Sequence, residues 1–329
     1  MDEYEKLIAA SREHQIEQEE QQKLTKQMKR TVSLSKIKLV LGMLTVLLMI
    51  LPVSYMFTFF YYAFVTKSTT LMDVTSQTLY VTEPNTSLEE MEFDMEFTPF
   101  SMQLKFDQYK RIGKEDFKVN AYDMRYTLGG LTKKEVNSSL ERVSRKYPTE
   151  TSPWLTHPDN QSEINSSKEW KILSGLPAET VVEAYISLND LSTVDEIRRS
   201  FQNVDVVWAA VDTGVEHSNL SADGKVVSPI GYPVQVDNTY WSPFRNAESN
   251  EQAFKDILNF IVQYEELATE VSSAKNLELN ERIAYINEHG IKTYAVVVTG
   301  PKKEIEKLRE TNLIRTMKIG EVKLWNWAI

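Results

Sequence analysis

The sequence predicts an α+β protein with a single N-terminal transmembrane helix, a β-rich module and a C-terminal domain with two β-α-β units around one sheet. Three observations support this: one long uncharged apolar stretch, alternation of apolar and polar residues after it, and two strand–helix–strand patterns near the C-terminus. The predicted segments are a cytoplasmic tail (1–38), a transmembrane helix (39–64), a β-rich module with one helix (65–145), a polar linker (146–168) and an α+β domain (169–329).

Residues 39–64 form the predicted membrane span. They contain no Asp, Glu, Lys or Arg and exceed the ~20 residues that a helix needs to cross a bilayer. Aromatic residues gather in the second half, as is typical near a membrane interface, and a spanning helix tolerates Pro52 with a kink. A cleaved signal peptide is the competing interpretation, but its apolar region of ~7–15 residues is shorter and begins nearer the N-terminus.

Basic residues before the span predict its orientation. This flank contains Lys23, Lys26, Lys29, Arg30, Lys36 and Lys38, whereas little basic charge follows Lys67 on the other side. Because cytoplasmic flanks carry an excess of Lys and Arg, we expect a cytoplasmic N-terminus and an extracellular C-terminal region.

The tail before this span has acidic residues in its first half and lysines in its second. Its composition favours a helix, but its apolar residues do not fall on one narrow stripe. The candidate partner-binding residues are Leu7, Ile8, Ile16, Leu24 and Met28. Two interpretations remain open: a solvated stalk next to the membrane, or a segment that becomes ordered on a partner.

Alternation with a period of two predicts strands in the β-rich module. Apolar residues alternate with polar ones over residues 91–106, with a break at Pro99, and again over residues 122–128. Thr132 and Glu135 have capping-box spacing and predict a helix whose apolar face is Val136, Leu140 and Val143. The polar, proline-containing residues 146–168 then predict a linker.

The C-terminal domain shows the same strand–helix–strand pattern twice. Residues 180–188 and 204–211 predict strands joined by a helix that begins at Ser192 and Asp195. Residues 293–298 and 314–325 predict two more strands, joined by a helix that begins at Gly300-Pro301. A split β-α-β arrangement around one sheet follows from this order.

Further signals lie between these two units. Helical spacing predicts one helix on Phe254, Ile257, Leu258 and Ile261 and another on Ile283 and Ile286 that ends at His289-Gly290. Asp223-Gly224 predicts a hairpin turn. Trp208, Trp325 and Trp327 fall in strands with a core pattern, whereas Trp154, Trp170 and Trp241 fall in loops and are candidates for a binding surface.

Composition argues against several classes of function. The chain has no cysteine, which excludes disulfides, thiol catalysis and cysteine-based zinc sites. The net charge of -10 argues against nucleic acid as the main ligand. His14, His157, His217 and His289 show no metal-binding spacing, and no motif of a nucleophile or a phosphate loop occurs. We therefore expect no cofactor, no metal site and no catalytic residues.

Three segments resemble the C-terminal domain of the sigma factor regulator family: residues 174–188 (SGLPAETVVEAYISL), 206–214 (VVWAAVDTG) and 296–308 (VVVTGPKKEIEKL). The basic tail with its membrane helix resembles the N-terminal portion of the same family. Such proteins occur in Bacillus-like Firmicutes and are similar to membrane-bound anti-sigma factors. The tail has no cysteine and is too short for the zinc-binding helical domain of many anti-sigma factors, so no sigma-contact residue is carried over.

The resemblance implies a membrane-bound regulator, without enzymatic activity, that controls an extracytoplasmic-function sigma factor in response to an envelope signal. Its expected partners are a sigma factor on the cytoplasmic side and an unknown envelope ligand or protein outside. Two alternatives remain: a membrane-anchored extracellular module that binds a cell-wall component or partner protein, and an envelope enzyme.

Overall fold

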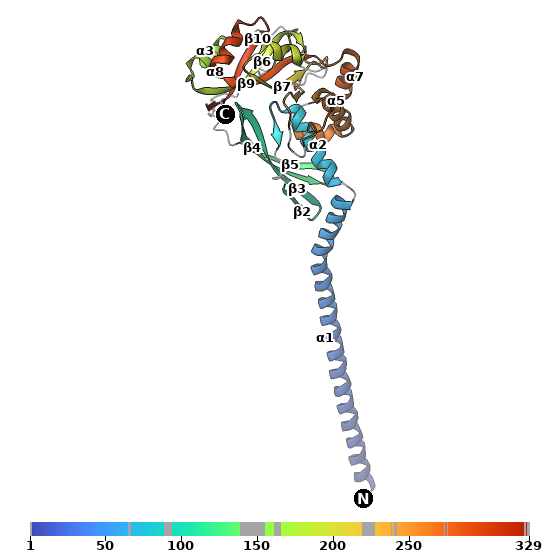
Figure 1. The fold of residues 1–329 in the computed structure, drawn as a ribbon. Helices are drawn as coiled ribbons and strands as arrows, with labels where there is room; N and C mark the ends of the chain where they lie inside the picture. The colour runs from blue at the N-terminus through green and yellow to red at the C-terminus, as the bar shows by residue number, and fades with distance from the viewer. Residues whose placement is uncertain are drawn as a thin grey trace. The chain divides into compact units, whose positions relative to one another are not determined.

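The computed structural model describes residues 2–64, 67–88, 94–138, 155–160, 166–218, 228–237, 239, 242–272, 274, 276–325 and 327 (Figure 1). It separates the chain into two units, Met1–Phe60 and Tyr61–Ile329. The second is called the C-terminal unit below, and each is described by itself.

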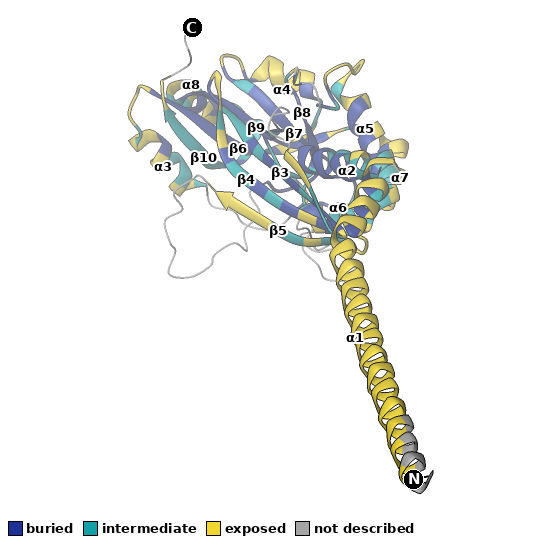
Figure 2. Cartoon of the chain, turned by 90° about the horizontal axis from the view of Figure 1, so that it is seen from below, coloured by how far each residue is buried: buried dark blue, intermediate teal, exposed yellow. Residues whose placement is uncertain are grey.

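The first unit is formed by one long helix, α1, which comprises Asp2–Phe64 and contains Pro52. Among the described residues, α1 is the one helix that is long and apolar enough to cross a membrane. Leu44, Leu47 and Leu48 in its apolar part are 57%, 66% and 70% exposed, and Figure 2 shows exposure along most of the helix. Because exposed apolar area is costly in water, this surface fits a lipid environment.

The C-terminal unit begins with the last residues of α1, which are followed by helix α2 (Lys67–Thr82). A five-stranded antiparallel sheet, called the first sheet, comes next. Its strands are β1 (Ser87–Leu88), β2 (Asp94–Thr98), β3 (Ser101–Ile112), β4 (Glu115–Thr127) and β5 (Gly130–Ser138). They pair in the order β1-β3-β4-β5, and β2 also pairs with β3. The predicted alternation is confirmed for β3 and β4, whose Met102, Leu104, Tyr122 and Met124 are buried.

The helix predicted from Thr132 is wrong, because this segment is strand β5. A turn with Gly130 at a φ of 115° reverses the chain, and β5 then pairs with β4 over its length. Thr132 Oγ1 donates a hydrogen bond to the carbonyl of Arg125 on β4 instead of capping a helix. Leu140 and Val143, from the predicted apolar face, lie outside the described residues.

The helix of this region is α2, which the sequence did not predict. Its buried residues are Leu71, Met72, Val74, Thr75, Ser76, Thr78, Leu79, Tyr80 and Val81. They occupy nearly every position of the last three turns, so no single apolar stripe marks the helix.

The second sheet contains β6 (Thr180–Ser192), β7 (Asp205–Val211), β8 (Gly231–Pro233), β9 (Thr293–Pro301) and β10 (Ile314–Leu324) in the order β10-β6-β9-β7-β8. Helix α4 (Val194–Ser200) joins β6 to β7, and α8 (Lys302–Lys307) with a short 3-10 turn (η3, Leu308–Glu310) joins β9 to β10. Since β9 lies antiparallel between β6 and β7, and β6 between β9 and β10, the two β-α-β units interleave. This confirms the split β-α-β prediction and corresponds to a ferredoxin-like arrangement extended by β8.

The remaining helices are α3 (Ser167–Gly175), α5 (Asn250–Ile261), η2 (Val262–Tyr264), α6 (Glu265–Ser272) and α7 (Leu279–His289). Helices α5 and α7 confirm the predictions from periodicity, and the predicted apolar face of α5 is buried. Helices α4 and α8 each begin about one residue away from the start that the sequence predicts. Thr193 with Glu196 forms the capping box of α4 in place of Ser192 and Asp195, and Pro301 ends β9 and is the N-cap of α8.

Part of the predicted polar linker packs against the second sheet. Leu155 is buried in a cluster with Trp208 and Tyr294, and Arg315 donates hydrogen bonds to the carbonyls of His157 and Asn160. The structure describes residues 155–160 and 166–168 of this segment. Asp223-Gly224 lies outside the described residues, as do Trp154 and Trp241.

The core prediction holds for Trp208, which is fully buried, but is wrong for Trp325, which is 46% exposed. Trp325 follows Leu324, the last residue of β10 that pairs with β6. Trp325 therefore lies past the end of β10, outside the paired part of the second sheet.

Candidate functional site

The five candidate residues of the tail all lie on the surface of α1. The exposed fractions are 70% for Leu7, 43% for Ile8, 59% for Ile16, 59% for Leu24 and 67% for Met28. At about 100° per residue, Leu24 and Met28 share one face, whereas Ile8 and Ile16 point to other sides. The helix therefore presents isolated apolar side chains and no continuous stripe.

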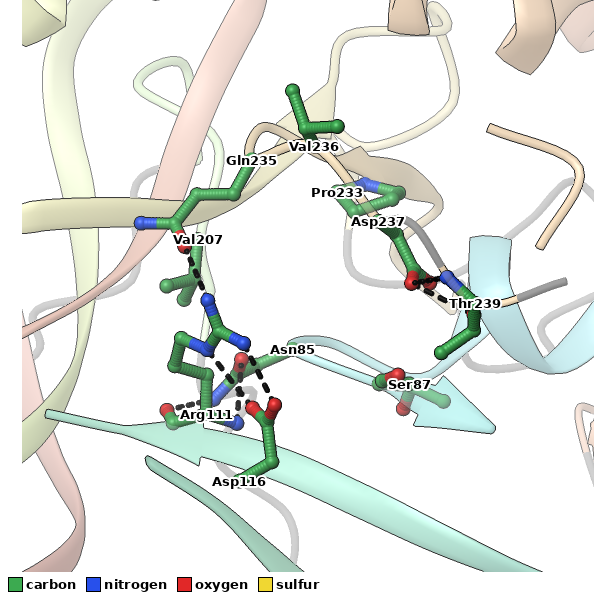
Figure 3. A pocket seen from close by; sticks show the side chains of 11 residues that line it. Asn85, Ser87, Arg111, Asp116, Val207, Pro233, Gln235, Val236, Asp237 and Thr239 are labelled. Atoms are coloured by element: carbon green, nitrogen blue, oxygen red, sulfur yellow. Dashed lines mark hydrogen bonds and ion pairs between the residues drawn. The ribbon is translucent and has the colours of Figure 1, made fainter. Parts of the chain in front are cut away.

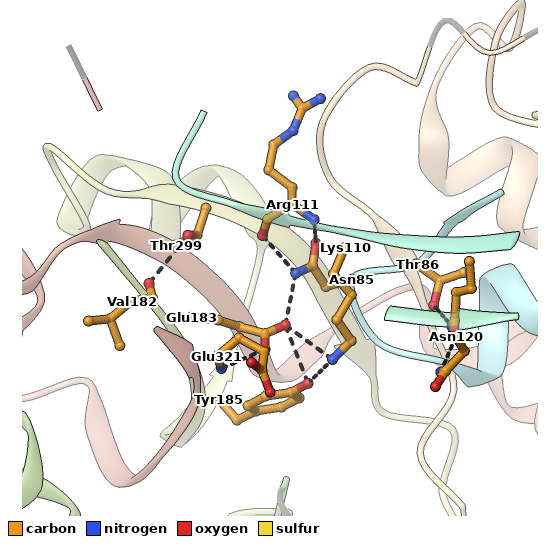
Figure 4. A network of polar contacts seen from close by, with 11 residues as sticks. Asn85, Thr86, Lys110, Arg111, Asn120, Val182, Glu183, Tyr185, Thr299 and Glu321 are labelled. Atoms are coloured by element: carbon orange, nitrogen blue, oxygen red, sulfur yellow. Dashed lines mark hydrogen bonds and ion pairs between the residues drawn. The ribbon is translucent and has the colours of Figure 1, made fainter. Parts of the chain in front are cut away.

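A buried polar network connects the two sheets of the C-terminal unit (Figure 4). Lys110 of β3 donates hydrogen bonds to the Tyr185 hydroxyl at 2.6 Å and to Glu183 Oε1 at 3.3 Å on β6. Asn85 Nδ2 donates to the same Glu183 oxygen at 2.8 Å. The backbone N–H of Glu321 on β10 donates to Glu183 Oε2 at 3.2 Å. Both carboxylate oxygens of Glu183, whose side chain is 1% exposed, thus have donors.

The charges in this network compensate each other. Burial alone would lower the pKa of Lys110, but the Glu183 carboxylate and the Tyr185 hydroxyl outweigh it and raise that pKa. Burial is the main reason that the pKa of Tyr185 is also raised. Lys110 therefore stays protonated and paired, which suits a structural connection better than proton transfer.

Next to the network, a cavity of about 420 Å³ opens between the two sheets (Figure 3). Arg111 pairs there with both carboxylate oxygens of Asp116, at 2.9 and 2.7 Å, and with Gln235 Oε1 at 3.3 Å. On the opposite wall, Asp237 accepts hydrogen bonds from the hydroxyl and the N–H of Thr239. These polar groups can bind a ligand through hydrogen bonds, and the lining residues include no histidine or lysine that would act as a base.

A second hollow, of about 820 Å³, lies near the end of β10. Its lining includes Trp325 and Trp327 together with Glu179, Asn203 and Glu304. Asn203 has a φ of 64° and donates a hydrogen bond to Glu304 at 3.3 Å. The exposed ring of Trp325 and the half-buried ring of Trp327, beside carboxylates and an amide, can bind a ligand that has both apolar faces and hydroxyl groups.

The histidines are separated from one another. His157 is buried, with Nε2 3.5 Å from Asp212, and its Nδ1 accepts a hydrogen bond from the Asp159 N–H. His217 is exposed, and His289 stacks on Tyr285 at the end of α7. Within the described ranges, no three His, Asp or Glu side chains converge in a way that could hold a metal ion.

Two family models match the chain. The sigma factor regulator N-terminal model matches residues 22–117, and the sigma factor regulator C-terminal model matches residues 173–321. The chain belongs to the sigma factor regulator family. A Bacillus subtilis (strain 168) protein named probable anti-sigma-M factor YhdL is 29% identical over 285 residues, which is 85% of this chain and 77% of that protein. No solved structure matches.

The buried network lies where the two matched segments of this sigma factor regulator meet. Asn85 and Lys110 belong to the N-terminal match, whereas Glu183 and Tyr185 belong to the C-terminal match. Sequence reasoning missed these residues. The signal that could have found them is Glu183, a lone charge inside the apolar strand 180–188.

Proposed function

We propose that this sigma factor regulator is a membrane-bound anti-sigma factor for an extracytoplasmic-function sigma factor. In this proposal residues 1–38 bind the sigma factor in the cytoplasm, residues 39–64 cross the membrane, and the C-terminal unit responds to an envelope signal outside. The observation that carries the proposal is the match to both parts of the family on a chain that also has a membrane-length apolar helix. The name of the Bacillus subtilis relative agrees with it.

The exposed tail supports a role in binding. Among the described side chains of residues 4–38, every one is exposed, so this part of α1 has no core of its own. An isolated amphiphilic segment of this kind gains stability by placing its apolar residues in a groove of a partner. Since Leu24 and Met28 share a face and other apolar residues point elsewhere, we expect the partner to surround the helix rather than to cover one side.

The membrane topology rests on charge. Five lysines and one arginine lie within residues 23–38, and little basic charge follows Lys67, which favours a cytoplasmic N-terminus. A signal outside then reaches the tail by a change in association, rotation or order of the segment, or by cleavage near the membrane. The cavity beside Arg111 and the hollow beside Trp325 are two places where an envelope ligand can bind.

The test is copurification with tagged full-length protein from detergent-solubilised membranes. We expect a sigma factor to copurify with the wild type and to be lost from the double variant Leu24→Asp/Met28→Asp, which places two charges on the apolar face. Gln18→Asp/Gln22→Asp is the matched control, because it adds the same charge at the same spacing on another face of α1.

The proposal is wrong if no sigma factor is retained by the wild type and deletion of the gene leaves every sigma-factor regulon unchanged. Equal retention by both double variants would instead remove Leu24 and Met28 from the binding surface. A reporter for the regulon should rise on deletion and fall again when the wild-type chain is restored.

The alternative function is a membrane-anchored extracellular binding module, which the exposed Trp325 and the half-buried Trp327 in one hollow favour. Replacing residues 1–38 by an unrelated soluble helix distinguishes the two. An anti-sigma factor loses its effect on the regulon, whereas a binding module keeps its function.

A further inference from the structure

One end of the first sheet consists of two neighbouring turns that carry no charge. The pairs Thr98↔Ser101, Ser101↔Thr127 and Thr127↔Gly130 place the β2–β3 turn beside the β4–β5 turn. Residues 97–102 (FTPFSM) and 126–131 (YTLGGL) contain no Asp, Glu, Lys or Arg. The two turns are therefore uncharged in themselves, although the Glu270 carboxylate of α6 lies 3.8 Å from where a Cβ of Gly130 would be.

Each turn exposes one large apolar side chain. Phe100 is 60% exposed and Leu128 is 61% exposed. Phe100 also has a φ of 62°, a conformation that is uncommon for a bulky residue. The fold thus holds an aromatic residue at the tip of a tight turn, outside the core, at a cost in backbone energy.

The same end of the sheet contacts the end of the apolar helix. The hydroxyl of Tyr62 donates a hydrogen bond to the carbonyl of Tyr126 at 3.2 Å, and its ring lies 6.0 Å from that of Phe97. Tyr62 belongs to the last turn of the apolar stretch 39–64, whose aromatic end corresponds to a membrane interface. Phe100 is three residues from Phe97 and Leu128 is two from Tyr126, so each tip lies within about 10 Å of a residue that Tyr62 contacts.

The opposite end of the same sheet is different. Its β3–β4 turn contains Lys114 and Glu115, and Lys114 pairs with Asp205 of β7 at 2.6 Å. The Gly113 N–H donates to the Thr299 hydroxyl of β9 at 2.7 Å. This turn packs against the second sheet through polar contacts, so exposed apolar tips are a property of one end only.

We propose that the Phe100 and Leu128 turns insert into the interface of the lipid bilayer, so that the first sheet rests directly on the membrane. An aromatic and an aliphatic side chain, both uncharged and on turns whose neighbouring residues contact the end of the apolar helix, have the chemistry of a lipid contact. A charged protein partner would instead require complementary charges, which the two turns do not have. This inference rests on the proposed membrane crossing.

The test measures how deep single spin labels lie in full-length protein reconstituted into vesicles of phosphatidylethanolamine and phosphatidylglycerol. The chain has no cysteine, so Phe100→Cys, Leu128→Cys, Lys114→Cys and Leu47→Cys each give one labelling site without further changes. Oxygen concentrates in lipid and a nickel chelate stays in water. We expect the ratio of their collision rates to be several-fold higher at positions 100 and 128 than at 114, and highest at 47.

The four labels separate the possible failures. If positions 100 and 128 match position 114 while 47 is in lipid, the membrane contact is wrong and the membrane crossing stands. Labels at 100 and 128 that are shielded from both reagents indicate a protein contact, which also overturns the proposal. A label at 47 that is accessible to the nickel chelate overturns the membrane crossing and this inference with it.

Discussion

The two units of the chain obtain their structure from different sources. In the first, α1 leaves residues such as Leu47 66% exposed, so its order comes from helix propensity and backbone hydrogen bonds. In the C-terminal unit, one large buried cluster includes residues of α2, of both sheets and of α5 to α8. The difference teaches that α1 leaves its apolar residues uncovered along most of its length, whereas the C-terminal unit buries most of its own.

The largest expected effect compares one aromatic residue from each unit. Phe254→Ala removes a fully buried ring from α5, and we expect it to lower the free energy of unfolding by about 4 kcal/mol. Phe57→Ala removes a ring that is 64% exposed on α1 and should change the free energy of unfolding by less than about 0.5 kcal/mol. Urea unfolding of the full-length protein in detergent, followed by tryptophan fluorescence, to which the buried Trp208 contributes, measures both. Equal effects would contradict the comparison.

The next effect separates a buried ion pair from an exposed one within the first sheet. Lys110→Met leaves the Glu183 carboxylate buried without its cation and should cost about 3 kcal/mol of unfolding free energy. Lys118→Met is the control, because Lys118 pairs with Asp107 while its side chain is 47% exposed, and should cost at most about 1 kcal/mol. If the two losses are the same, Lys110 is not the buried connection described above.

A smaller effect tests how closely β8 approaches β7. A Cβ at Gly231 would lie 2.0 Å from the Ala209 carbonyl oxygen, so Gly231→Ala forces the two strands apart. We expect a loss of about 2 kcal/mol in the same unfolding measurement. Gly42→Ala in α1 meets nothing within 4 Å and should leave the unfolding of the C-terminal unit unchanged. A neutral Gly231→Ala would show that the edge strand adjusts freely.

The smallest effect depends on pH. Burial alone would raise the pKa of Asp212, but His157, the Gly214 N–H and the Tyr285 hydroxyl outweigh it and hold that pKa below its ordinary value of 3.8. A lowered carboxyl pKa stabilises the folded state above the ordinary value, and this contribution is lost as the pH falls through the folded pKa. Asp212→Asn should therefore cost about 1 kcal/mol at pH 7 and nothing at the acid limit.

The control for this pH dependence is Asp256→Asn. Asp256 is exposed on α5 and accepts a hydrogen bond from Gln252 of the same helix. Its substitution should leave the curve of stability against pH unchanged. If Asp212→Asn still lowers the free energy of unfolding at acid pH, the loss comes from packing and not from the charge of Asp212.

Much of the fold could be predicted because its signals are local. The apolar run of residues 39–64, the alternation in β3 and β4 and the i, i+3, i+4 spacing in α5 each lie within one element. Two local signals misled. The Thr132–Glu135 spacing resembles a helix start, but pairing with β4 across the Gly130 turn is stronger than a capping preference. Helix α2 has buried residues around most of its surface, so periodicity does not reveal it.

The candidate sites could be predicted much less well. The tail residues Leu7, Ile8, Ile16, Leu24 and Met28 stay a prediction about binding, although their exposure agrees with it. The network of Lys110 and Glu183 joins positions 73 residues apart, and the cavity beside Arg111 adds Gln235 from still farther along the chain. Such sites depend on which strands become neighbours, which no spacing within one element specifies.

The strand order of the second sheet also has a consequence for biosynthesis. Strand β6 lies between β9 and β10, and Val181 pairs with Pro301 on one side and with Lys323 on the other. Because a chain is made from its N-terminus, β6 emerges long before either neighbour exists. Residues 193–292, somewhat less than a third of the chain, must be made before the first of these two neighbours begins. During that interval the nascent protein is exposed to proteases and to aggregation, so its yield depends on the speed of synthesis as well as on its final stability.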